Sequence, residues 1–107
     1  MLKFHNRFVG GILSGEKTIT VRDTSRVFKR EIHGAFTPDS KLPFAWIQIK
    51  NVSLTRLGNV YYKDAGFAHI DDYIAFLQKV YDRVFTEESK VYVIEFELMP
   101  LKWEIKT

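Results

Sequence analysis

Apolar and polar residues alternate most cleanly in the segment Thr18–Asp23. Successive side chains of a β-strand point to opposite faces, so Ile19 and Val21 share one face while Thr20 and Arg22 share the other. The pattern predicts a strand that buries one face in a core. Its polar face has two interpretations, an ordinary half-exposed surface or a functional site.

A short helix is expected just before this strand. Leu2–Phe4 is apolar enough for a first strand, and Asn6 is a typical N-cap for a helix over Arg7–Ser14. Gly15 suits the end of that helix, where a left-handed backbone conformation is favourable only for glycine. The next strand therefore starts almost immediately after the helix.

Three more strands are expected towards the C-terminus, and Trp46 is expected in the core. The strands cover Glu31–Phe36, Phe44–Leu57 with a bend at Asn51, and Val91–Met99. Between and after them we expect a loop over residues 24–30, a turn over 37–40, a short helix within 57–64, and an edge strand or tail over 101–106.

The strongest helical pattern begins at Asp71 or Asp72, either of which suits the N-cap. Apolar residues then recur at i, i+3, i+4 and i+7, namely Tyr73, Ile74, Phe76, Leu77, Val80, Tyr81 and Val84. Such a stripe is typical of a helix packed on a hydrophobic core. We therefore expect core here rather than a cofactor site.

The order of these elements predicts the α+β class, with a mostly antiparallel sheet and flanking helices. In a short chain such a sheet often curls into a small β-barrel, because closure hides its edges. A chain of 107 residues that is 46% hydrophobic has enough apolar side chains for one core. We expect a single domain over residues 1–107.

Composition excludes several classes of protein. The chain has no cysteine, so disulfides, thiol catalysis and cysteine zinc sites are ruled out. His5, His33 and His69 show no metal-ligand spacing, and no phosphate-binding glycine loop is present, so neither a metal nor another cofactor is expected. No apolar run is long enough to span a bilayer. We expect a soluble, cytoplasmic protein without membrane contact.

Net charge adds a weak preference for anionic partners. The formal charge of +3 and the pI near 9.2 favour nucleic acid, although many soluble enzymes carry a similar balance. The basic residues near the first helix and strand include Lys17, Arg22, Arg26, Lys29 and Arg30. Both a solvated basic surface and an RNA contact remain open.

Individual residues of this region offer candidate chemistry. A hydroxyl near a lysine is a nucleophile with a base, as in the pair Lys17 and Thr20. Arg22 suits a carbonyl or phosphate group, or equally an ion pair with Asp23, Glu95 or Glu97. Arg7 opens a helix, where the positive end of the helix dipole is unfavourable for a cation, so an acidic partner or a ligand is expected nearby. Phe67 is one of the aromatic residues that suit stacking on a base.

The block Arg7-Phe8, Ile12-Leu13-x-Gly15-x-Lys17-Thr18-Ile19-Thr20-Val21-Arg22-Asp23, with Val91–Phe96, resembles the ASCH domain family. Within it, the lysine-threonine-isoleucine-threonine run is most similar to the small bacterial N(4)-acetylcytidine amidohydrolases. The resemblance covers essentially the whole chain and is weakest over residues 27–41. It implies a PUA-like β-barrel with flanking helices and a cleft for a modified nucleoside or an RNA segment.

The resemblance also implies a catalytic group of a lysine, a threonine and a glutamate. By motif position the first two are Lys17 and Thr20, with Thr20 as nucleophile and Lys17 as base. These two residues have opposite parity on a strand, so they converge only if Lys17 precedes the regular alternation or its long side chain curls around the strand end. For contact with the substrate, the candidates are Arg7, Arg22 and Phe67, on the chemistry given above.

The glutamate has no direct counterpart. Its position falls on Ala65 when aligned by Gly66-Phe67, and on Ile70 when counted back from the long helix. Asp64 is the nearest carboxylate in that loop and is the candidate to replace it. Asp71 is better explained as a helix cap.

Two hypotheses from different classes follow. One is an amidohydrolase that removes the acyl group from N(4)-acetylcytidine or a related acylated nucleoside. The other is a non-catalytic RNA- or nucleotide-binding module, which would show salt-sensitive affinity. RNA cleavage, known for some ASCH proteins, is a third class, but the sequence offers no specific acid and base pair for it.

Overall fold

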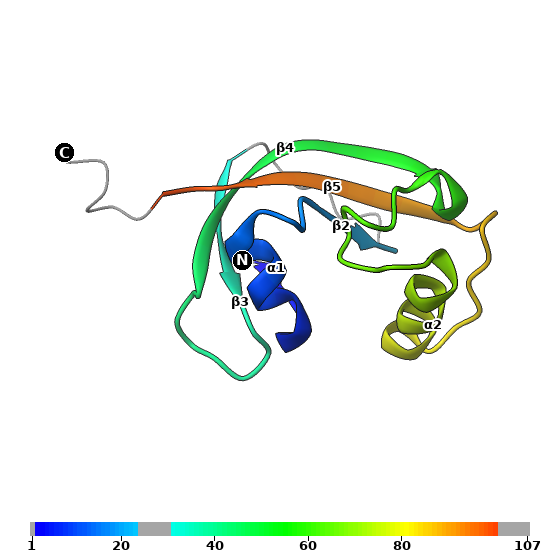
Figure 1. Cartoon of the computed structure of the whole chain (residues 1–107), viewed down its shortest axis with the longest axis horizontal. Helices are drawn as coiled ribbons and strands as arrows, with labels where there is room; N and C mark the ends of the chain where they lie inside the picture. Colours follow the sequence, from blue (N-terminus) through cyan, green and yellow to red (C-terminus); the bar gives the residue numbers. More distant parts are fainter. Residues whose placement is uncertain (1, 24–30, 101–107) are drawn as a thin grey trace.

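The computed structural model describes residues 2–23 and 31–100. Five strands and two α-helices form the fold, with two short 3-10 helices (Figure 1). In chain order they are β1 (Leu2–Lys3), η1 (Asn6–Phe8), α1 (Val9–Ser14), β2 (Ile19–Arg22), β3 (Ile32–Phe36), β4 (Ala45–Arg56), η2 (Leu57–Asn59), α2 (Ile70–Tyr81) and β5 (Lys90–Leu98). The loop expected over 24–30 and the segment expected over 101–106 lie outside the described residues.

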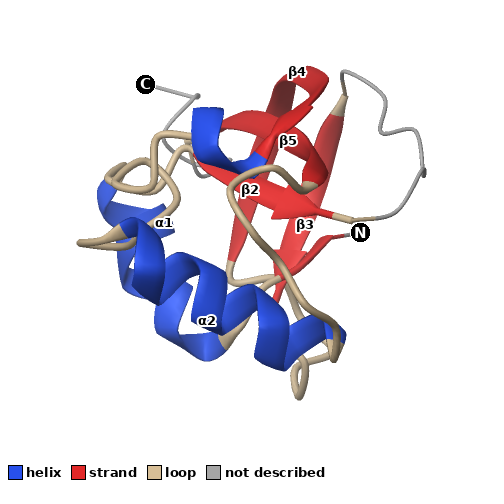
Figure 2. Ribbon diagram, turned by 90° about the vertical axis from the view of Figure 1, so that its right-hand side faces the viewer, coloured by secondary structure: helices blue, strands red, loops and turns tan. Residues whose placement is uncertain are grey.

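The five strands form one curled sheet in the order β1-β3-β4-β5-β2, and α1 and α2 lie on one side of it (Figure 2). Only β1 and β3 are parallel, and the other three pairs are antiparallel. The pairing of β4 with β5 shifts register between Ile49 and Asn51, which confirms the bend expected at Asn51. The α+β class and the mostly antiparallel sheet are therefore confirmed.

The curled sheet is a half-barrel, because β1 and β2 are its two edges and do not pair as strands. A side chain joins them instead: Nη2 of Arg22 in β2 donates a hydrogen bond to the Lys3 carbonyl oxygen in β1, at 2.9 Å. This seam between β1 and β2 leaves unpaired backbone groups, which must find other partners. It is the part of the fold on which the candidate site is built.

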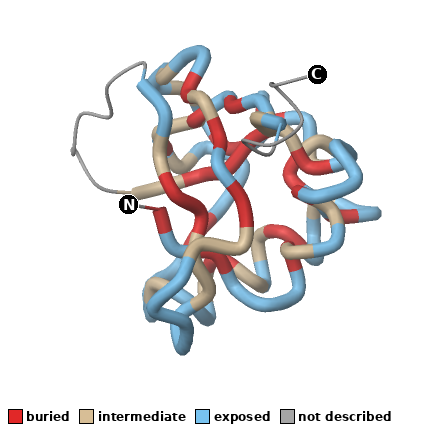
Figure 3. Tube along the Cα trace, turned by 90° about the vertical axis from the view of Figure 1, so that its left-hand side faces the viewer, coloured by how far each residue is buried: buried red, intermediate tan, exposed pale blue. Residues whose placement is uncertain are grey.

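The core lies between the concave face of the sheet and the helices, and buried positions follow the strands (Figure 3). Its largest fully buried side chains are Ile12, Ile47, Ile49, Leu57, Val91 and Ile94. The first half of β4 contributes Ala45, Ile47 and Ile49, whereas residues 51–56 have no fully buried side chain. Trp46, expected in the core, is 48% exposed because it alternates with these buried residues and points outward.

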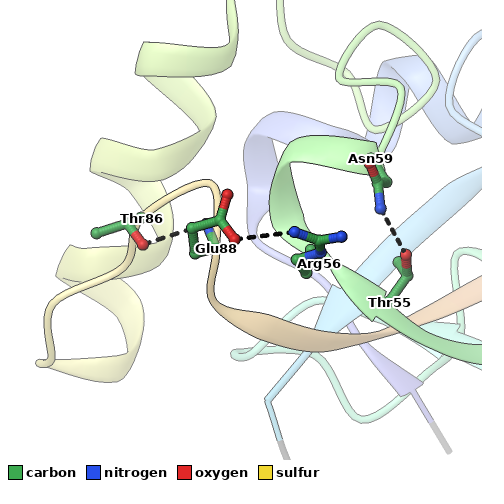
Figure 4. A network of polar contacts seen from close by, with 5 residues as sticks. All are labelled: Thr55, Arg56, Asn59, Thr86 and Glu88. Atoms are coloured by element: carbon green, nitrogen blue, oxygen red, sulfur yellow. Dashed lines mark hydrogen bonds and ion pairs between the residues drawn. The ribbon is translucent and has the colours of Figure 1, made fainter.

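The far end of β4 is tied to the loop before β5 by polar contacts (Figure 4). Nη1 of Arg56 lies 3.0 Å from Oε2 of Glu88, and the Glu88 backbone N–H donates to Oγ1 of Thr86 at 3.2 Å. Asn59 donates to Oγ1 of Thr55 at 3.4 Å. Because Arg56 and Glu88 are both exposed, we expect their ion pair to contribute little to stability.

The first helix ends where expected, but α2 ends at Tyr81, so Val84, expected in its apolar stripe, lies outside the helix and is 78% exposed. The capping residues also differ from expectation. The first helix starts as a 3-10 turn, and its N-terminal cap is the Nδ1 atom of His5, which accepts from the Arg7 N–H at 3.1 Å, rather than Asn6. Gly15 ends α1 with a φ of 84°, as predicted. The N-cap of α2 is His69, so Asp71 and Asp72 lie within the first turn of the helix. Their negative charges interact favourably there with the positive end of the helix dipole.

Among the described residues, no helix is long and apolar enough to cross a membrane.

Candidate active site

Lys17 is a buried cation between α1 and β2. Its backbone N–H donates to the Gly11 carbonyl oxygen at 3.0 Å, which folds residues 15–18 back against α1. Its side chain is only 2% exposed. Because lysine side chains are almost never fully buried without a partner, this position needs a specific explanation.

Two backbone carbonyl groups hold the Lys17 amine. Nζ donates to the carbonyl oxygens of Ile19 at 2.8 Å and Ala65 at 2.7 Å, and it lies 4.3 Å from the centre of the Phe8 ring. A neutral amine has two N–H donors and one lone pair, so both donors can be satisfied by these carbonyls while the lone pair stays free. The arrangement therefore suits the neutral, basic form of Lys17.

Burial lowers the pKa of Lys17 from its ordinary 10.5 to about 7, and repulsion from Arg22 and then Arg7 acts in the same direction. A pKa near the working pH is optimal for a general base, because much of the amine is then neutral while its basicity is retained. Lys17 meets this condition.

Thr20 lies on β2, paired with Ile94 of β5, and its side chain is 7% exposed. Sequence alternation allows one exposed face for this strand, but Ile19, Thr20 and Val21 are all buried, and α2 lies across the cavity that Thr20 lines. Thr20 and Lys17 line the same cavity. Because Lys17 precedes the first strand residue, the alternation of β2 does not fix the direction of its side chain.

The shared cavity has a volume of about 230 Å³ and lies at the seam between β1 and β2, under α2. It is lined by Lys3, Phe4, His5, Phe8, Lys17, Thr20, Val21, Arg22, Pro38, Tyr73, Phe76, Leu77, Val80 and Tyr81. The apolar stripe of α2 was expected to be core only. Tyr73 and Leu77 are indeed in the core, and the stripe from Tyr73 to Tyr81 also forms one wall of this cavity.

Arg22 extends into the same cavity. Besides its hydrogen bond to Lys3, its guanidinium lies 5.4 Å from the centre of the Phe4 ring. Its Nε is buried and has no hydrogen-bond acceptor among residues 2–23 and 31–100. Of the ion pairs considered for Arg22, Asp23 pairs with Arg83 at 3.6 Å instead. A buried N–H without an acceptor is costly, so a ligand carbonyl or phosphate oxygen here would be favourable.

Asp64 acts through its backbone. Its carbonyl oxygen accepts from the Thr18 N–H at 2.9 Å and from the Ile19 N–H at 3.3 Å, which anchors the start of β2. Asp64 lines neither this cavity nor the neighbouring one, and no aspartate or glutamate is among the residues that line the first. The next residue, Ala65, contacts Lys17 through its carbonyl group.

Arg7 and Phe67 lie together in a second cavity, separate from Arg22. Phe67 is 4% exposed and stacks on Tyr73, with ring centres 4.6 Å apart. The Arg7 guanidinium lies 4.3 Å from the centre of the Phe67 ring. Stacking of a base on Phe67 would therefore require Arg7 to move.

Sequence reasoning missed the aromatic wall of the first cavity, above all Tyr73. Burial raises the pKa of the Tyr73 hydroxyl, and the nearby Val21 backbone of β2 acts weakly in the opposite direction. Helical spacing did reveal Tyr73, but that spacing cannot separate a core residue from a cavity wall. In the described ranges no cluster of three metal-ligating side chains occurs.

The lowered pKa of Lys17 predicts a pH dependence of stability. Between about pH 7 and 10.5 the unfolded chain holds a proton that the folded chain lacks, so the free energy of unfolding should rise with pH by up to about 1.4 kcal/mol per unit. Below about pH 7 both states are protonated, so Lys17 no longer makes the free energy of unfolding depend on pH. Urea unfolding of the wild type and Lys17→Met between pH 6 and about 9 would measure it.

Other titrating groups are common to both proteins, so the difference between their unfolding free energies isolates Lys17. Parallel pH curves for the two proteins would show that Lys17 titrates normally, and would contradict the prediction.

Solved structures with a similar fold include an ASCH domain from Lactobacillus crispatus, with 17% identity and a TM-score of 0.66 over 87% of this chain and 70% of that one. A protein from Enterococcus faecalis assigned to DUF984 has 18% identity and a TM-score of 0.65 over 95% of this chain and 73% of that one. A point mutant of an ASCH protein from Zymomonas mobilis has 11% identity and a TM-score of 0.66 over 91% of this chain and 68% of that one. No protein-family model and no curated protein matches the sequence. The chain therefore has an ASCH-domain fold.

Proposed function

We propose that this chain, with its ASCH-domain fold, is an amidohydrolase that removes the acyl group from N(4)-acetylcytidine or a related acylated nucleoside. One observation carries the proposal: a buried lysine amine, with a pKa lowered to about 7, lines the same cavity as a buried threonine hydroxyl. A hydroxyl is a weak nucleophile until a base removes its proton. The cavity supplies both groups.

In the first half of the reaction, Lys17 Nζ takes the proton of the Thr20 hydroxyl as Oγ1 attacks the acyl carbonyl carbon. The C–N bond to the exocyclic nitrogen then breaks, and protonated Lys17 returns the proton to that nitrogen. The products of this half are free cytidine and an acyl ester on Thr20.

In the second half, neutral Lys17 takes a proton from water as the water oxygen attacks the ester carbonyl. The bond between Oγ1 and the acyl carbon breaks, and Lys17 gives its proton back to Oγ1. Acetic acid leaves with the second proton of the water and loses it to solvent as acetate. One base thus serves both halves, and no carboxylate has to transfer a proton.

The rest of the first cavity suits a small aromatic ring with a polar carbonyl. Its volume of about 230 Å³ is below the roughly 300–1,000 Å³ of most ligand pockets, which favours a single base over an oligonucleotide. Phe4, Phe8 and Phe76 offer apolar contacts to the ring. The free N–H of Arg22 would bind the acyl carbonyl oxygen and stabilise the negative charge that develops on it.

The missing glutamate is compensated, in this proposal, by the Ala65 carbonyl, which orients the Lys17 amine at 2.7 Å. A neutral carbonyl does not favour the protonated lysine as a carboxylate would, so the low pKa of Lys17 is preserved. Asp64 supports the same geometry by anchoring the start of β2.

The absence of an acidic residue from the first cavity wall also favours a second candidate, a non-catalytic nucleotide- or RNA-binding module. Lys3, Lys17 and Arg22 make this wall cationic. Such a module would bind its ligand with affinity that falls steeply as salt rises, and would release it unchanged.

Purified protein should convert N(4)-acetylcytidine to cytidine and acetate, which chromatography of the nucleosides and an acetate assay would measure. A panel of acylated nucleosides followed by mass would define the acyl group and the base. Salt-dependent binding without any product, at micromolar enzyme, would exclude the amidohydrolase and support the binding module.

A further inference from the structure

A second cavity, of about 600 Å³, adjoins the first at Lys17 and Phe8, which line both. Its other walls are Arg7, Gly11, Glu16, Lys63, Gly66, Phe67 and Ala68. It is larger than the first cavity, and the proposed hydrolysis of a nucleoside does not use it. Its position beside the Lys17 amine makes it a candidate for the remainder of the substrate.

The Arg7 side chain, which lines this cavity, lies among three aromatic rings. The guanidinium carbon lies 4.3 Å from the ring centre of Phe67, 5.4 Å from that of Phe8 and 5.6 Å from that of Phe76. Stacking on aromatic rings occupies the planar face of a guanidinium and leaves its in-plane N–H donors available. Those donors match the geometry of phosphate oxygens.

Lys63 is the second cation, and it belongs to an ordered turn. The Lys63 carbonyl oxygen accepts from the Gly66 N–H at 3.0 Å, and the Phe67 N–H donates to Tyr62 at 3.0 Å. Gly66 has a φ of 96°, and a Cβ there would lie 3.4 Å from the Phe8 ring, so a glycine lets this turn pass close to Phe8. The turn therefore brings Lys63 to the cavity that also contains Arg7.

Neither cation is neutralised by an ion pair within residues 2–23 and 31–100, where the ion pairs involve Glu31, Asp23, Glu88 and Glu97. Glu16 is the one carboxylate in this cavity wall, against the two cations Arg7 and Lys63. The balance of charge in the cavity therefore favours an anion.

We propose that the second cavity binds a phosphate group, held by Arg7 and Lys63 beside Lys17. The phosphate comes from the substrate itself, so that the acylated base enters the first cavity as part of a nucleotide. Phosphate binding stands independently of catalysis, whereas the preference for a nucleotide substrate rests on the proposed function.

Binding is tested first, by following backbone amide resonances while inorganic phosphate or cytidine 5′-monophosphate is added. Both ligands should shift the resonances of residues 7, 63 and 66–68, with affinities that weaken as salt increases. Arg7→Gln and Lys63→Gln should each weaken phosphate binding, by about tenfold for Arg7→Gln. Lys50→Gln, which removes a surface cation paired with Glu97, is the matched control and should leave binding unchanged.

Because Arg7 also packs on three rings, Lys63→Gln provides a test that does not disturb the aromatic cluster. Unchanged resonances at these residues with millimolar phosphate, or equal affinity in the wild type and both variants, would overturn the site.

Substrate preference is tested by the ratio of kcat/KM for N(4)-acetylcytidine 5′-monophosphate to that for N(4)-acetylcytidine. The ratio should be about ten or more in the wild type and should fall towards one in Lys63→Gln. A ratio near one in the wild type, with phosphate still bound, would mean that the site takes free phosphate and would overturn the nucleotide preference. If phosphate binds and neither compound is hydrolysed, the proposed function fails while the phosphate site stands.

Discussion

Replacing Lys17 with methionine is expected to lower kcat/KM for N(4)-acetylcytidine by about 10²–10⁴-fold, because a positioned general base contributes that much. In the wild type, log(kcat/KM) should rise with pH at a slope of one and level off above about pH 7, where Lys17 loses its proton. The sign follows from the mechanism, since only the neutral amine can accept the Thr20 proton. Initial rates between pH 5 and about 9 would measure both effects.

Lys17→Arg is the matched control for charge. Arginine keeps a positive charge and hydrogen-bond donors but stays protonated throughout this pH range, so it cannot act as a base. Activity should be lost in this variant as fully as in Lys17→Met. A Lys17→Arg enzyme with near wild-type rates, or a wild-type pH profile without a step near 7, would contradict the assignment of Lys17 as base.

Replacing Thr20 with valine should lower kcat by about 10³-fold or more, since valine keeps the shape of threonine but has no oxygen to attack the acyl group. Thr20→Ser retains the hydroxyl and should keep a substantial part of the rate. Rapid quenching of the wild type and mass measurement of the intact protein should reveal a species heavier by one acetyl group. This species should be absent from Thr20→Val.

Two outcomes would separate Thr20 from the chemistry. Full activity of Thr20→Val would show that water attacks directly, with Lys17 as its base. Equal loss in Thr20→Ser and Thr20→Val, with unfolding transitions like that of the wild type, would indicate that Thr20 matters for cavity shape and not for its hydroxyl.

The spacing of apolar, polar and glycine residues along the chain predicted the helices and the strand that position the candidate active site. The left-handed turn at Gly15 follows from the absence of a side chain, and the strand at β2 follows from alternation of Ile19 and Val21 with polar residues. The stripe of α2 likewise follows from 3.6-residue periodicity. These are properties of a few neighbouring residues, so the sequence contains the information directly.

The capping residues and the position of Trp46 were predicted wrongly, because each depends on competition between neighbours. Asn6 is a good capping residue, yet His5 makes the hydrogen bond to the Arg7 N–H. Trp46 is apolar enough for the core, but it alternates along β4 with the buried Ala45 and Ile47. Its side chain therefore lies on the opposite, exposed face of the strand.

By itself, the amino-acid sequence determined that a lysine and a threonine lie three positions apart beside a glycine turn and a β-strand. Tertiary structure alone decided that the Lys17 amine is buried against the carbonyl of Ala65, 48 residues away in the chain. It also decided that residues of α2 line a cavity. Arg22 and Arg7, close in sequence, line two different cavities for the same reason. The reason is physical: periodicity reports which face of an element is apolar, whereas burial, lowered pKa and shared cavities arise only when distant elements pack together.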